Sequence, residues 1–326
     1  MNGSPRLKFF LILLSGVIFL WNCSTAPRQS TLVTGSNQDI QAVLGRWDVT
    51  VYDPVTGAYP SWFEITGTPQ TLGGQFVGRV GSARPIRYAH YDGKDLVLSL
   101  SPQYENQVQD LLLAGTVSGN RIDGTTFSES GQRIRFSASR APALTRQASP
   151  QGGEPVDLIG ENFSGWRARY RDRKNGWAVN DGVLVNTPPS VDIVSRRTFN
   201  DFKLHAEFKF PKGSNSGIYL RGRYEMQVQD DYGNEPESHE CGGIYGFIAP
   251  RVIAVNPPGE WNSVDITLIG RRVTIEMNGK SLMENAEIPG ITGGALNSRE
   301  GEPGPIMLQG DHGTVQYRNV VVTPAR

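Results

Sequence analysis

Short runs of alternating hydrophobic and polar residues recur along residues 38–140. They begin about every 8–12 residues, a spacing that is typical of all-β sandwiches and barrels. Gly93 and Gly119 lie in short polar segments between runs, where tight turns require a positive φ. The runs cover residues 47–52, 61–65, 75–80, 86–91, 95–99, 110–117, 121–126 and 132–137. Because each run follows the last through a short turn, the pattern predicts a small up-and-down β-barrel, which leaves no exposed strand edge.

A second set of alternating runs follows residues 141–155, a segment without periodicity that is rich in proline and glycine and is predicted to be an interdomain linker. In residues 202–210, large apolar side chains alternate with charged ones, the pattern of a sheet with one buried face. Residues 264–268 and 272–277 alternate likewise, and Asn278-Gly279 predicts a type I′ hairpin turn. Residues 156–326 are therefore expected to form a two-sheet β-sandwich, so the whole chain is expected to be all-β.

Residues 218–223 and 224–229 are predicted to be adjacent strands with one polar face. That face would carry Tyr219, Arg221, Arg223, Glu225, Gln227 and Gln229. Phenol, guanidinium, carboxylate and amide groups together suit a sugar, whose hydroxyls need donors and acceptors while its C–H faces need flat apolar contact. The alternative is a solvated outer face with ordinary cross-strand ion pairs.

The N-terminus has the order of a secretory signal. Arg6 and Lys8 precede an apolar run over residues 9–21, which is too short to span a bilayer stably. Residues 20–23, Leu-Trp-Asn-Cys, resemble a bacterial lipobox, so residues 1–22 are interpreted as the signal peptide, Cys23 as the lipidated first residue and residues 23–37 as a tether. Cleavage after Ala26, which would release a soluble secreted protein, and an uncleaved anchor are alternatives.

Composition excludes several function classes. The chain has 32 Lys and Arg against 32 Asp and Glu, and this balance argues against nucleic acid as a partner. Membrane contact is expected only through the lipid anchor. Export removes the chain from cytosolic nucleotide pools, and the sequence 279–281 lacks the upstream glycine of a phosphate-binding loop, because Thr274 stands there. Two cysteines, Cys23 and Cys241, cannot build a disulfide framework.

Residues 230–241 form the most charged segment of the chain. Oxygen ligands at this density could hold Ca²⁺, and histidine with cysteine could hold a softer ion. The weak metal-ligand candidates are Asp230, Asp231, Glu235 and His239. Their spacing matches no recognised loop, so a solvated lid beside the site is the preferred interpretation. No cofactor is otherwise expected.

Five sequence blocks follow one another in residues 157–326. They are residues 215–222 (Asn-Ser-Gly-Ile-Tyr-Leu-Arg-Gly), 224–228 (Tyr-Glu-Met-Gln-Val), 242–246 (Gly-Gly-Ile-Tyr-Gly), 259–262 (Gly-Glu-Trp-Asn) and 304–313, closing with 317–320 (Tyr-Arg-Asn-Val). This region resembles the 3-keto-disaccharide hydrolase family, with Gly310 as an extra residue between Gln309 and Asp311. The resemblance implies a concanavalin-like jelly-roll sandwich that acts on 3-keto-glycosides. A partner sugar 3-dehydrogenase would make that ketone. Residues 44–47, after a short helix expected at 38–43, loosely resemble the opening of a lipocalin-like barrel.

The implied chemistry explains the residue types. A ketone at C3 acidifies the C2 hydrogen, so cleavage can proceed by proton abstraction, loss of the C1 leaving group and addition of water. This route needs a base, an acid and a stabiliser for the enolate. We assign proton transfer to His312 or Glu225 and enolate stabilisation to Arg221. Substrate positioning is assigned to Tyr219, Gln227, Tyr245, Gln309 and Asp311.

The sequence therefore favours an exported glycan-processing enzyme, either a periplasmic or outer-membrane lipoprotein or a secreted protein. A non-catalytic carbohydrate-binding envelope lipoprotein is the main alternative, because a fold does not determine a function. A third is an envelope scaffold whose barrel binds a lipid or a partner. The barrel is assigned no site, since Trp47, Trp62, Phe63 and Phe76 are expected in its core. His205 and His90 are expected to be solvated.

Overall fold

The computed structural model describes residues 39–104, 108–146, 152–160 and 163–325. These described residues belong to one compact unit. The predicted signal peptide, the tether with Cys23, and residues 147–151 of the predicted linker lie outside the described residues. No helix in the described part of the chain has the length and apolar character needed to cross a membrane.

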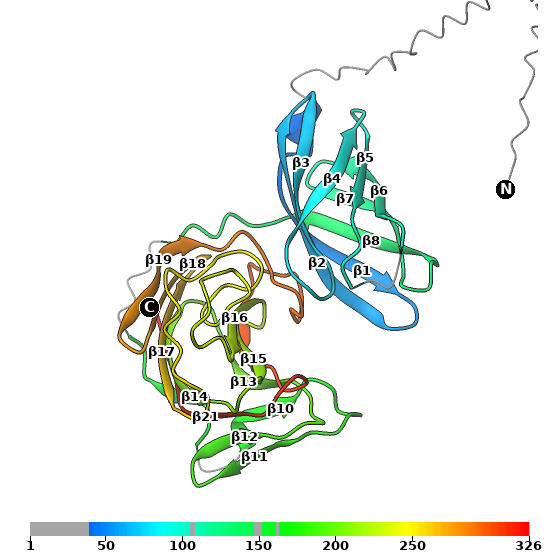
Figure 1. The fold of residues 1–326 in the computed structure, drawn as a ribbon. Coiled ribbons are helices and arrows are strands. Elements are labelled where there is room, and N and C mark those ends of the chain that lie inside the picture. The colour runs from blue at the N-terminus through cyan, green and yellow to red at the C-terminus, as the bar shows by residue number, and fades with distance from the viewer. Residues whose placement is uncertain (1–38, 105–107, 147–151, 161–162, 326) are drawn as a thin grey trace, which may run out of the picture. The chain divides into compact units, whose positions relative to one another are not determined.

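Eight antiparallel strands close into a β-barrel in sequence order, as predicted (Figure 1). They are β1 (Gly45–Asp53), β2 (Gly57–Thr68), β3 (Thr71–Val77), β4 (Arg84–Tyr91), β5 (Asp95–Leu100), β6 (Leu111–Ser118), β7 (Arg121–Phe127) and β8 (Arg133–Arg140), after a 3₁₀ turn η1 (Asp39–Ala42). The last strand pairs back with the first, from Trp47 opposite Arg140 to Tyr52 opposite Arg135. Closure pairs both edges that an open sheet would expose.

The side-chain alternation of the strands fills the barrel. Leu96, Leu98 and Leu100 of β5 are buried in its core, as are Phe63 and Phe76. Their burial removes apolar surface from water, the main favourable contribution to folding. Trp47 also lies in this core, as expected from the sequence.

Trp62 is buried in a different core from its neighbour Phe63. Successive residues of a strand point to opposite faces, so Trp62 leaves the barrel and joins the apolar cluster of the following sandwich, together with Val77. Its ring meets Phe247 edge-on with 5.6 Å between ring centroids. A Cβ on Gly290 would overlap the Trp62 ring, so the sandwich provides a fitted space for this side chain.

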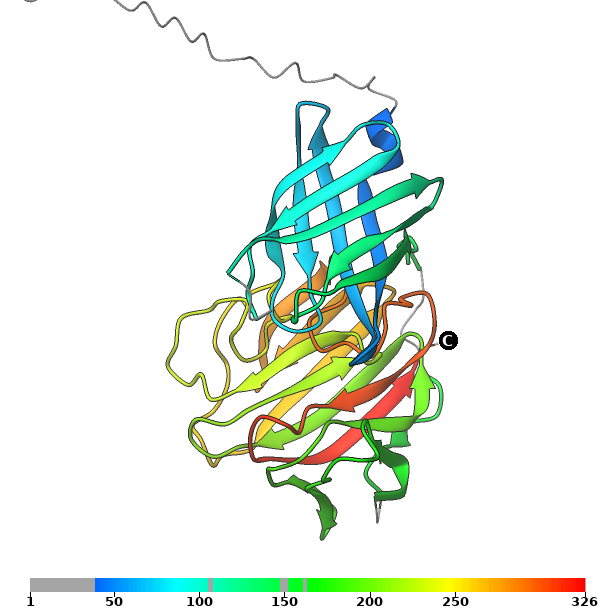
Figure 2. The same ribbon diagram turned by 90° about the vertical axis from the view of Figure 1, so that its right-hand side faces the viewer.

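Two sheets form a jelly-roll β-sandwich after the barrel, and Figures 1 and 2 show them as stacked layers. The sandwich strands are β9 (Val156–Asp157), β10 (Trp166–Ala168), β11 (Trp177–Asn180), β12 (Val183–Asn186), β13 (Ile193–Phe199), β14 (Phe202–Lys209), β15 (Asn215–Leu220), β16 (Tyr224–Gln229), β17 (Asn262–Ile269), β18 (Arg272–Met277), β19 (Lys280–Glu287), β20 (Gly304–Leu308) and β21 (Val315–Pro324), with a 3₁₀ turn η2 (Phe163–Gly165) before β10. One sheet has the order β10-β13-β20-β15-β16, and the other has the order β11-β12-β21-β14-β17-β18-β19, with β9 on β21. The all-β fold class is confirmed.

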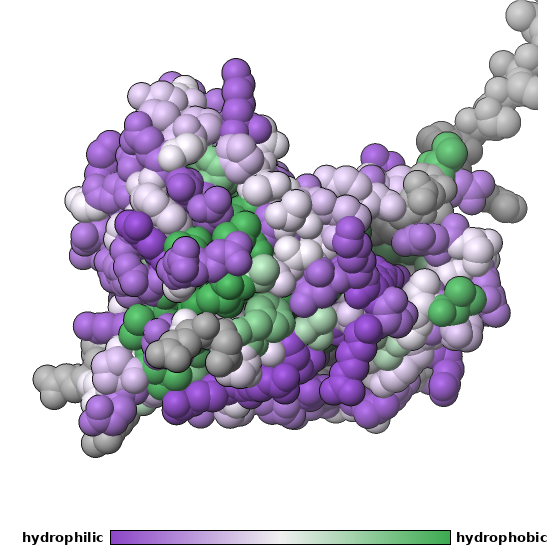
Figure 3. Space-filling view, turned by 90° about the horizontal axis from the view of Figure 1, so that it is seen from below, coloured by the Kyte–Doolittle hydropathy of each residue, from purple (hydrophilic) through white to green (hydrophobic). Residues whose placement is uncertain are grey.

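The alternation in β14, β17 and β18 places apolar residues between the sheets and polar residues outside. Phe202, Leu204 and Phe208 are buried in the sandwich core, whereas Lys203 is exposed. Hydrophilic residues cover much of the face in Figure 3, and hydrophobic residues gather in a hollow within it. Asn278 and Gly279 have φ values of 50° and 74°, the two positive values that a type I′ turn requires.

The predicted strand over residues 218–223 is wrong at its end. β15 stops at Leu220, because Arg221 and Gly222 adopt φ values of 52° and 64° and turn the chain into β16. The Arg221 side chain therefore leaves the polar face of β15. It is fully buried elsewhere and donates to the Gly270 carbonyl oxygen at 2.6 Å and to the Tyr224 hydroxyl oxygen at 3.2 Å.

Arg221 joins a buried cluster of ionisable groups. Glu300 accepts a hydrogen bond from Tyr224 at 2.8 Å and forms an ion pair with Arg271. Asp48 of β1 lies beside this pair, and burial, followed by the negative charge of Glu300, raises the pKa of Asp48 to about 8. A buried carboxyl group next to another carboxylate keeps its proton because two unscreened negative charges are costly.

Stability is expected to depend on pH through Asp48. The unfolded carboxyl loses its proton near its ordinary pKa of 3.8, whereas the folded one keeps it to about pH 8. Between these values the unfolded state binds fewer protons, so the free energy of unfolding falls as pH rises. Asp48→Asn keeps a donor toward Glu300 and should flatten this dependence when melting temperatures are measured from pH 5 to pH 9. An unchanged slope in the variant would contradict the assignment.

Candidate functional site

A cavity of about 590 Å³ lies over the polar face of β15 and β16. Its volume is within the range of small-ligand sites, about 300–1,000 Å³. The structure brings every predicted catalytic and substrate-binding residue except Arg221 to this cavity. These residues are Tyr219, Glu225, Gln227, Tyr245, Gln309, Asp311 and His312. Their proximity is a structural result, while their chemical roles remain predictions.

Strand pairing places the polar side chains of β15 and β16 together. Tyr219 is opposite Glu225, and Gly217 is opposite Gln227, so these positions share one face of the sheet. Glu225 is 4% exposed and Gln227 is 2% exposed. This burial argues against the alternative of a solvated outer face.

Glu225 is held in the floor of the cavity by its neighbours on β15. The Tyr219 hydroxyl oxygen lies 2.8 Å from Glu225 Oε2 and 3.0 Å from the Gly293 carbonyl oxygen. A Cβ on Gly217 would collide with the carboxyl group of Glu225, so only glycine leaves room for its present position. Burial raises the pKa of Glu225 to about 8, and the hydrogen bond from Tyr219 partly opposes this rise. Glu225 is therefore mainly protonated at neutral pH.

The loop after β16 covers the free edge of that strand. Backbone N–H groups of Gly242 and Tyr245 donate to the carbonyl oxygens of Gln227 and Glu225, at 2.8 and 3.0 Å. These bonds satisfy an edge that would otherwise be exposed. They also bring Tyr245 to the cavity wall, where burial raises the pKa of its phenol to about 12 and keeps it a hydrogen-bond donor.

The charged segment 230–241 belongs to the same loop and organises it. Buried Asp231 accepts hydrogen bonds from the backbone N–H of Cys241 at 2.7 Å and from the Gln229 side chain at 2.8 Å. Asp230 accepts one from the Gly213 N–H. Among the described residues, no three His, Cys, Asp or Glu side chains are grouped closely enough to hold a metal ion, and this includes Glu235 and His239.

Asp311 and His312 lie on the loop that follows β20. Gln309 N–H donates to the Gly217 carbonyl oxygen at 3.0 Å, which ties the start of this loop to β15. His312 Nδ1 lies 2.6 Å from Asp311 Oδ1. This hydrogen bond raises the pKa of His312 and lowers the pKa of Asp311. The carboxylate also fixes the ring and leaves Nε2 available, an arrangement common in histidine general bases.

Arg169 and Asp192 line the cavity but did not stand out in the sequence. Arg169 forms an ion pair with Asp192 at 3.0 Å and donates to the Gly294 carbonyl oxygen at 2.8 Å. Asp192 also accepts from the Gly310 N–H at 3.1 Å, so it holds the loop of Asp311 in place. Burial raises the pKa of Asp192, and the charge of Asp311 adds to this effect. In the sequence, the charged run over residues 169–173 is the feature that could have pointed to Arg169 as a site residue.

Two amide oxygens in the cavity have no hydrogen-bond partner among the described residues. They are Oε1 of Gln227 and Oε1 of Gln309. A buried polar atom without a partner costs about 1–3 kcal/mol, so such atoms in a cavity mark places where a ligand or water donates. Sugar hydroxyls are suitable donors for both.

Arg221 does not reach this cavity. Arg221 Nη2 donates to the Gly270 carbonyl oxygen and to the Tyr224 hydroxyl oxygen, both outside the cavity. Arg221 Nε and Nη1 have no partner among the described residues. The predicted stabilisation of an enolate by Arg221 therefore has no geometric support.

The fold and the cavity together define a jelly-roll protein with a buried carboxyl group and a histidine–aspartate pair at a sugar-sized site. Residues 154–323 match the family model described as a 3-keto-alpha-glucoside-1,2-lyase-like domain. This is just over half of the chain, and the chain belongs to that family.

Individual relatives are more distant. The chain is 24% identical over 212 residues to the 3-keto-disaccharide hydrolase of Bacteroides thetaiotaomicron, covering 51% of this chain and 72% of that protein. It is 26% identical to a Parabacteroides distasonis protein assigned as a glycosyl hydrolase, with a TM-score of 0.46 over 57% of this chain and 97% of that one. A second structure from the same organism has 25% identity and a TM-score of 0.43, covering 56% and 97%.

The hydrogen bond from Tyr219 is expected to control the protonation of Glu225. Tyr219→Phe removes a donor to the carboxylate while keeping the ring, so the pKa of Glu225 should rise further above its ordinary value. NMR titration of ¹³C-labelled glutamate side chains measures this directly. A pKa that stays the same or falls would show that the bond does not favour the charged form.

Proposed function

We propose that the protein cleaves 3-keto-glycosides, with the keto sugar bound in the cavity over β15 and β16. The observation that carries the proposal is the pairing of Glu225 with the His312–Asp311 dyad in one cavity that also holds two amide oxygens in need of donors. Membership of the 3-keto-alpha-glucoside-1,2-lyase-like family supports the substrate class. The ketone would be supplied by an oxidation at C3, the reaction of a sugar 3-dehydrogenase.

Proton transfer is divided between the two groups by their environments. His312 Nε2 takes the C2 proton, because Asp311 holds the other ring nitrogen. The electron pair of the C2–H bond forms an enolate with charge on O3. The C3 carbonyl then reforms as the C1–C2 double bond forms and the C1–O bond breaks, while protonated Glu225 gives its proton to the leaving oxygen. Addition of water across the double bond releases the free 3-keto-sugar.

The negative charge on O3 needs a cation or a donor at the cavity wall. Arg169 is the guanidinium whose position suits this role, since it lines the cavity and is held by Asp192 and two backbone carbonyls. The Tyr245 phenol is an additional donor. Gln227 and Gln309 would accept from the hydroxyls of the ring and fix its orientation.

Replacing either proton-transfer group should abolish most activity. His312→Ala and Glu225→Gln should each lower kcat for a 3-keto-glycoside by at least ~10², the usual contribution of a positioned acid or base.

The pH dependence of activity should follow the protonation of Glu225. In the wild-type protein, kcat/KM should fall above about pH 8 as Glu225 loses its proton, and Glu225→Gln should remove this fall in activity at alkaline pH. The measurement is release of free 3-keto-sugar across a pH series.

His205→Gln is a matched control for these variants. His205 is on β14 of the other sheet and lies 2.9 Å from Asp265, away from the cavity. Its replacement should leave kcat within about twofold, as expected for a surface change. Near-normal activity in both site variants would reject the assignment. Binding of the substrate without product in the wild-type protein would instead support a non-catalytic carbohydrate-binding protein.

We also propose that residues 1–22 direct export and that Cys23 carries a lipid, as their sequence pattern indicates. The wild-type protein should then partition into the detergent phase of a Triton X-114 extract. Cys23→Ser should move to the aqueous phase, because the thiol that accepts the lipid is lost. Detergent partitioning that is unchanged by the substitution would favour an uncleaved anchor, and an aqueous wild-type protein would favour secretion.

A further inference from the structure

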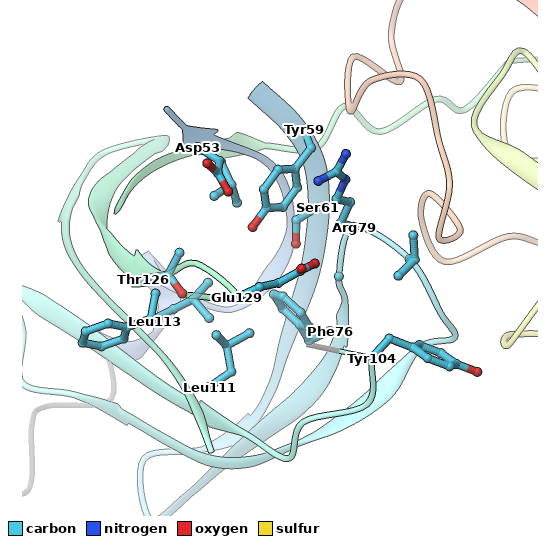
Figure 4. A pocket seen from close by; sticks show the side chains of 14 residues that line it. Asp53, Tyr59, Ser61, Phe76, Arg79, Tyr104, Leu111, Leu113, Thr126 and Glu129 are labelled. Atoms are coloured by element: carbon cyan, nitrogen blue, oxygen red, sulfur yellow. The ribbon is translucent and has the colours of Figure 1, made fainter. Parts of the chain in front are cut away.

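The barrel contributes side chains to the cavity that contains Glu225 and His312. Arg79, Tyr104 and Glu129 line this cavity, and they also line a smaller one at the end of the barrel (Figure 4). The smaller cavity is about 40 Å³, which is too small for a sugar. A sugar can therefore meet Arg79, Tyr104 and Glu129 only in the larger cavity, where they form part of the wall.

The contact between this wall and the sandwich is closely fitted. Gly294 N–H donates to the Arg79 carbonyl oxygen at 3.0 Å. A Cβ on Gly293 would collide with the Gly81 carbonyl oxygen, and a Cβ on Gly246 would lie 2.5 Å from the Ser82 Cβ. Backbone packed this closely against backbone leaves little freedom, so the barrel residues keep a fixed position at the cavity.

The contact between Gly293 and the barrel is linked through Tyr219 to Glu225, which lies in the floor of the cavity. The Gly293 carbonyl oxygen lies 3.0 Å from the Tyr219 hydroxyl, which contacts Glu225. On the outer side, Tyr104 forms a hydrogen bond with Tyr245. The barrel thus meets the cavity in two places. Its backbone at Arg79 contacts the sandwich near the buried end of the cavity, and the Tyr104 side chain lies at the open end.

Exposure separates the two ends of the cavity. Glu225 is 4% exposed, whereas Tyr104 is 56% exposed. A keto sugar placed with its C1 oxygen against Glu225 would occupy the buried end. The leaving group is bonded to that C1 oxygen and, because Glu225 closes the floor of the cavity, it would extend toward the open end, beside Tyr104, Arg79 and Glu129.

We infer that these three barrel residues form the subsite for the leaving group, and that they contact the second ring of a disaccharide substrate. This inference rests on the proposed function. The guanidinium of Arg79 donates to adjacent hydroxyls and the carboxylate of Glu129 accepts from them. The Tyr104 ring offers a flat apolar face to the C–H groups of a ring. A small alkyl leaving group would use none of these contacts.

The test compares two substrates that share the same 3-keto-hexose, a 3-keto-disaccharide and the methyl 3-keto-hexoside. Tyr104→Ala and Arg79→Ala should each lower the ratio of their kcat/KM values, disaccharide over methyl glycoside, by about tenfold, the effect of losing one good contact. Arg79→Ala keeps the backbone bond to Gly294. Tyr88→Ala, at an exposed tyrosine of β4 outside the cavity, is the matched control and should leave the ratio unchanged.

An unchanged ratio in both site variants, or an equal change in Tyr88→Ala, would overturn the inference. If the wild-type protein cleaves neither substrate, the proposed function fails, and binding decides the subsite separately. Calorimetry with the unoxidised disaccharide and methyl glycoside should then show tighter binding of the disaccharide, reduced about tenfold by Tyr104→Ala. Equal affinity of the wild-type protein for both ligands would reject the subsite.

Discussion

The burial of one carboxyl group, Glu225, sets the protonation state on which the proposed chemistry depends. Desolvation makes its charged form costly, so the group keeps a proton that an exposed glutamic acid would lose. Glycine at position 217 provides the space, and the phenol of Tyr219 supplies the polar contact that makes the burial tolerable. The surrounding loops matter because they exclude water from this group.

Local sequence patterns predicted much of the fold. Alternation and glycine turns identified the eight barrel strands, because each forms with its neighbour in sequence and needs no distant information. The same patterns located β14, β17 and β18 of the sandwich. The end of β15 was missed, since a positive φ at Arg221, a residue type that rarely adopts it, cannot be read from alternation.

The site was predictable where its residues lie on paired strands and not where they come from distant loops. Tyr219, Glu225 and Gln227 share a face because β15 and β16 are consecutive. Asp192 holds Gly310 from 118 positions away, a relation that depends on the order of strands in the sheet. The contribution of barrel residues to the cavity lining could not be predicted for the same reason. Arg79 and Tyr104 reach the cavity only through tertiary packing.

Trp62 makes the stability of the sandwich depend on the barrel. Its ring occupies the core of the sandwich while its backbone belongs to the barrel, and Gly290 leaves the space it fills. Losing the barrel would open a void of the kind that costs about 3–5 kcal/mol when a large aromatic is removed from a core. The two halves are therefore not interchangeable modules. The sandwich therefore depends for part of its folding stability on a side chain that the barrel supplies.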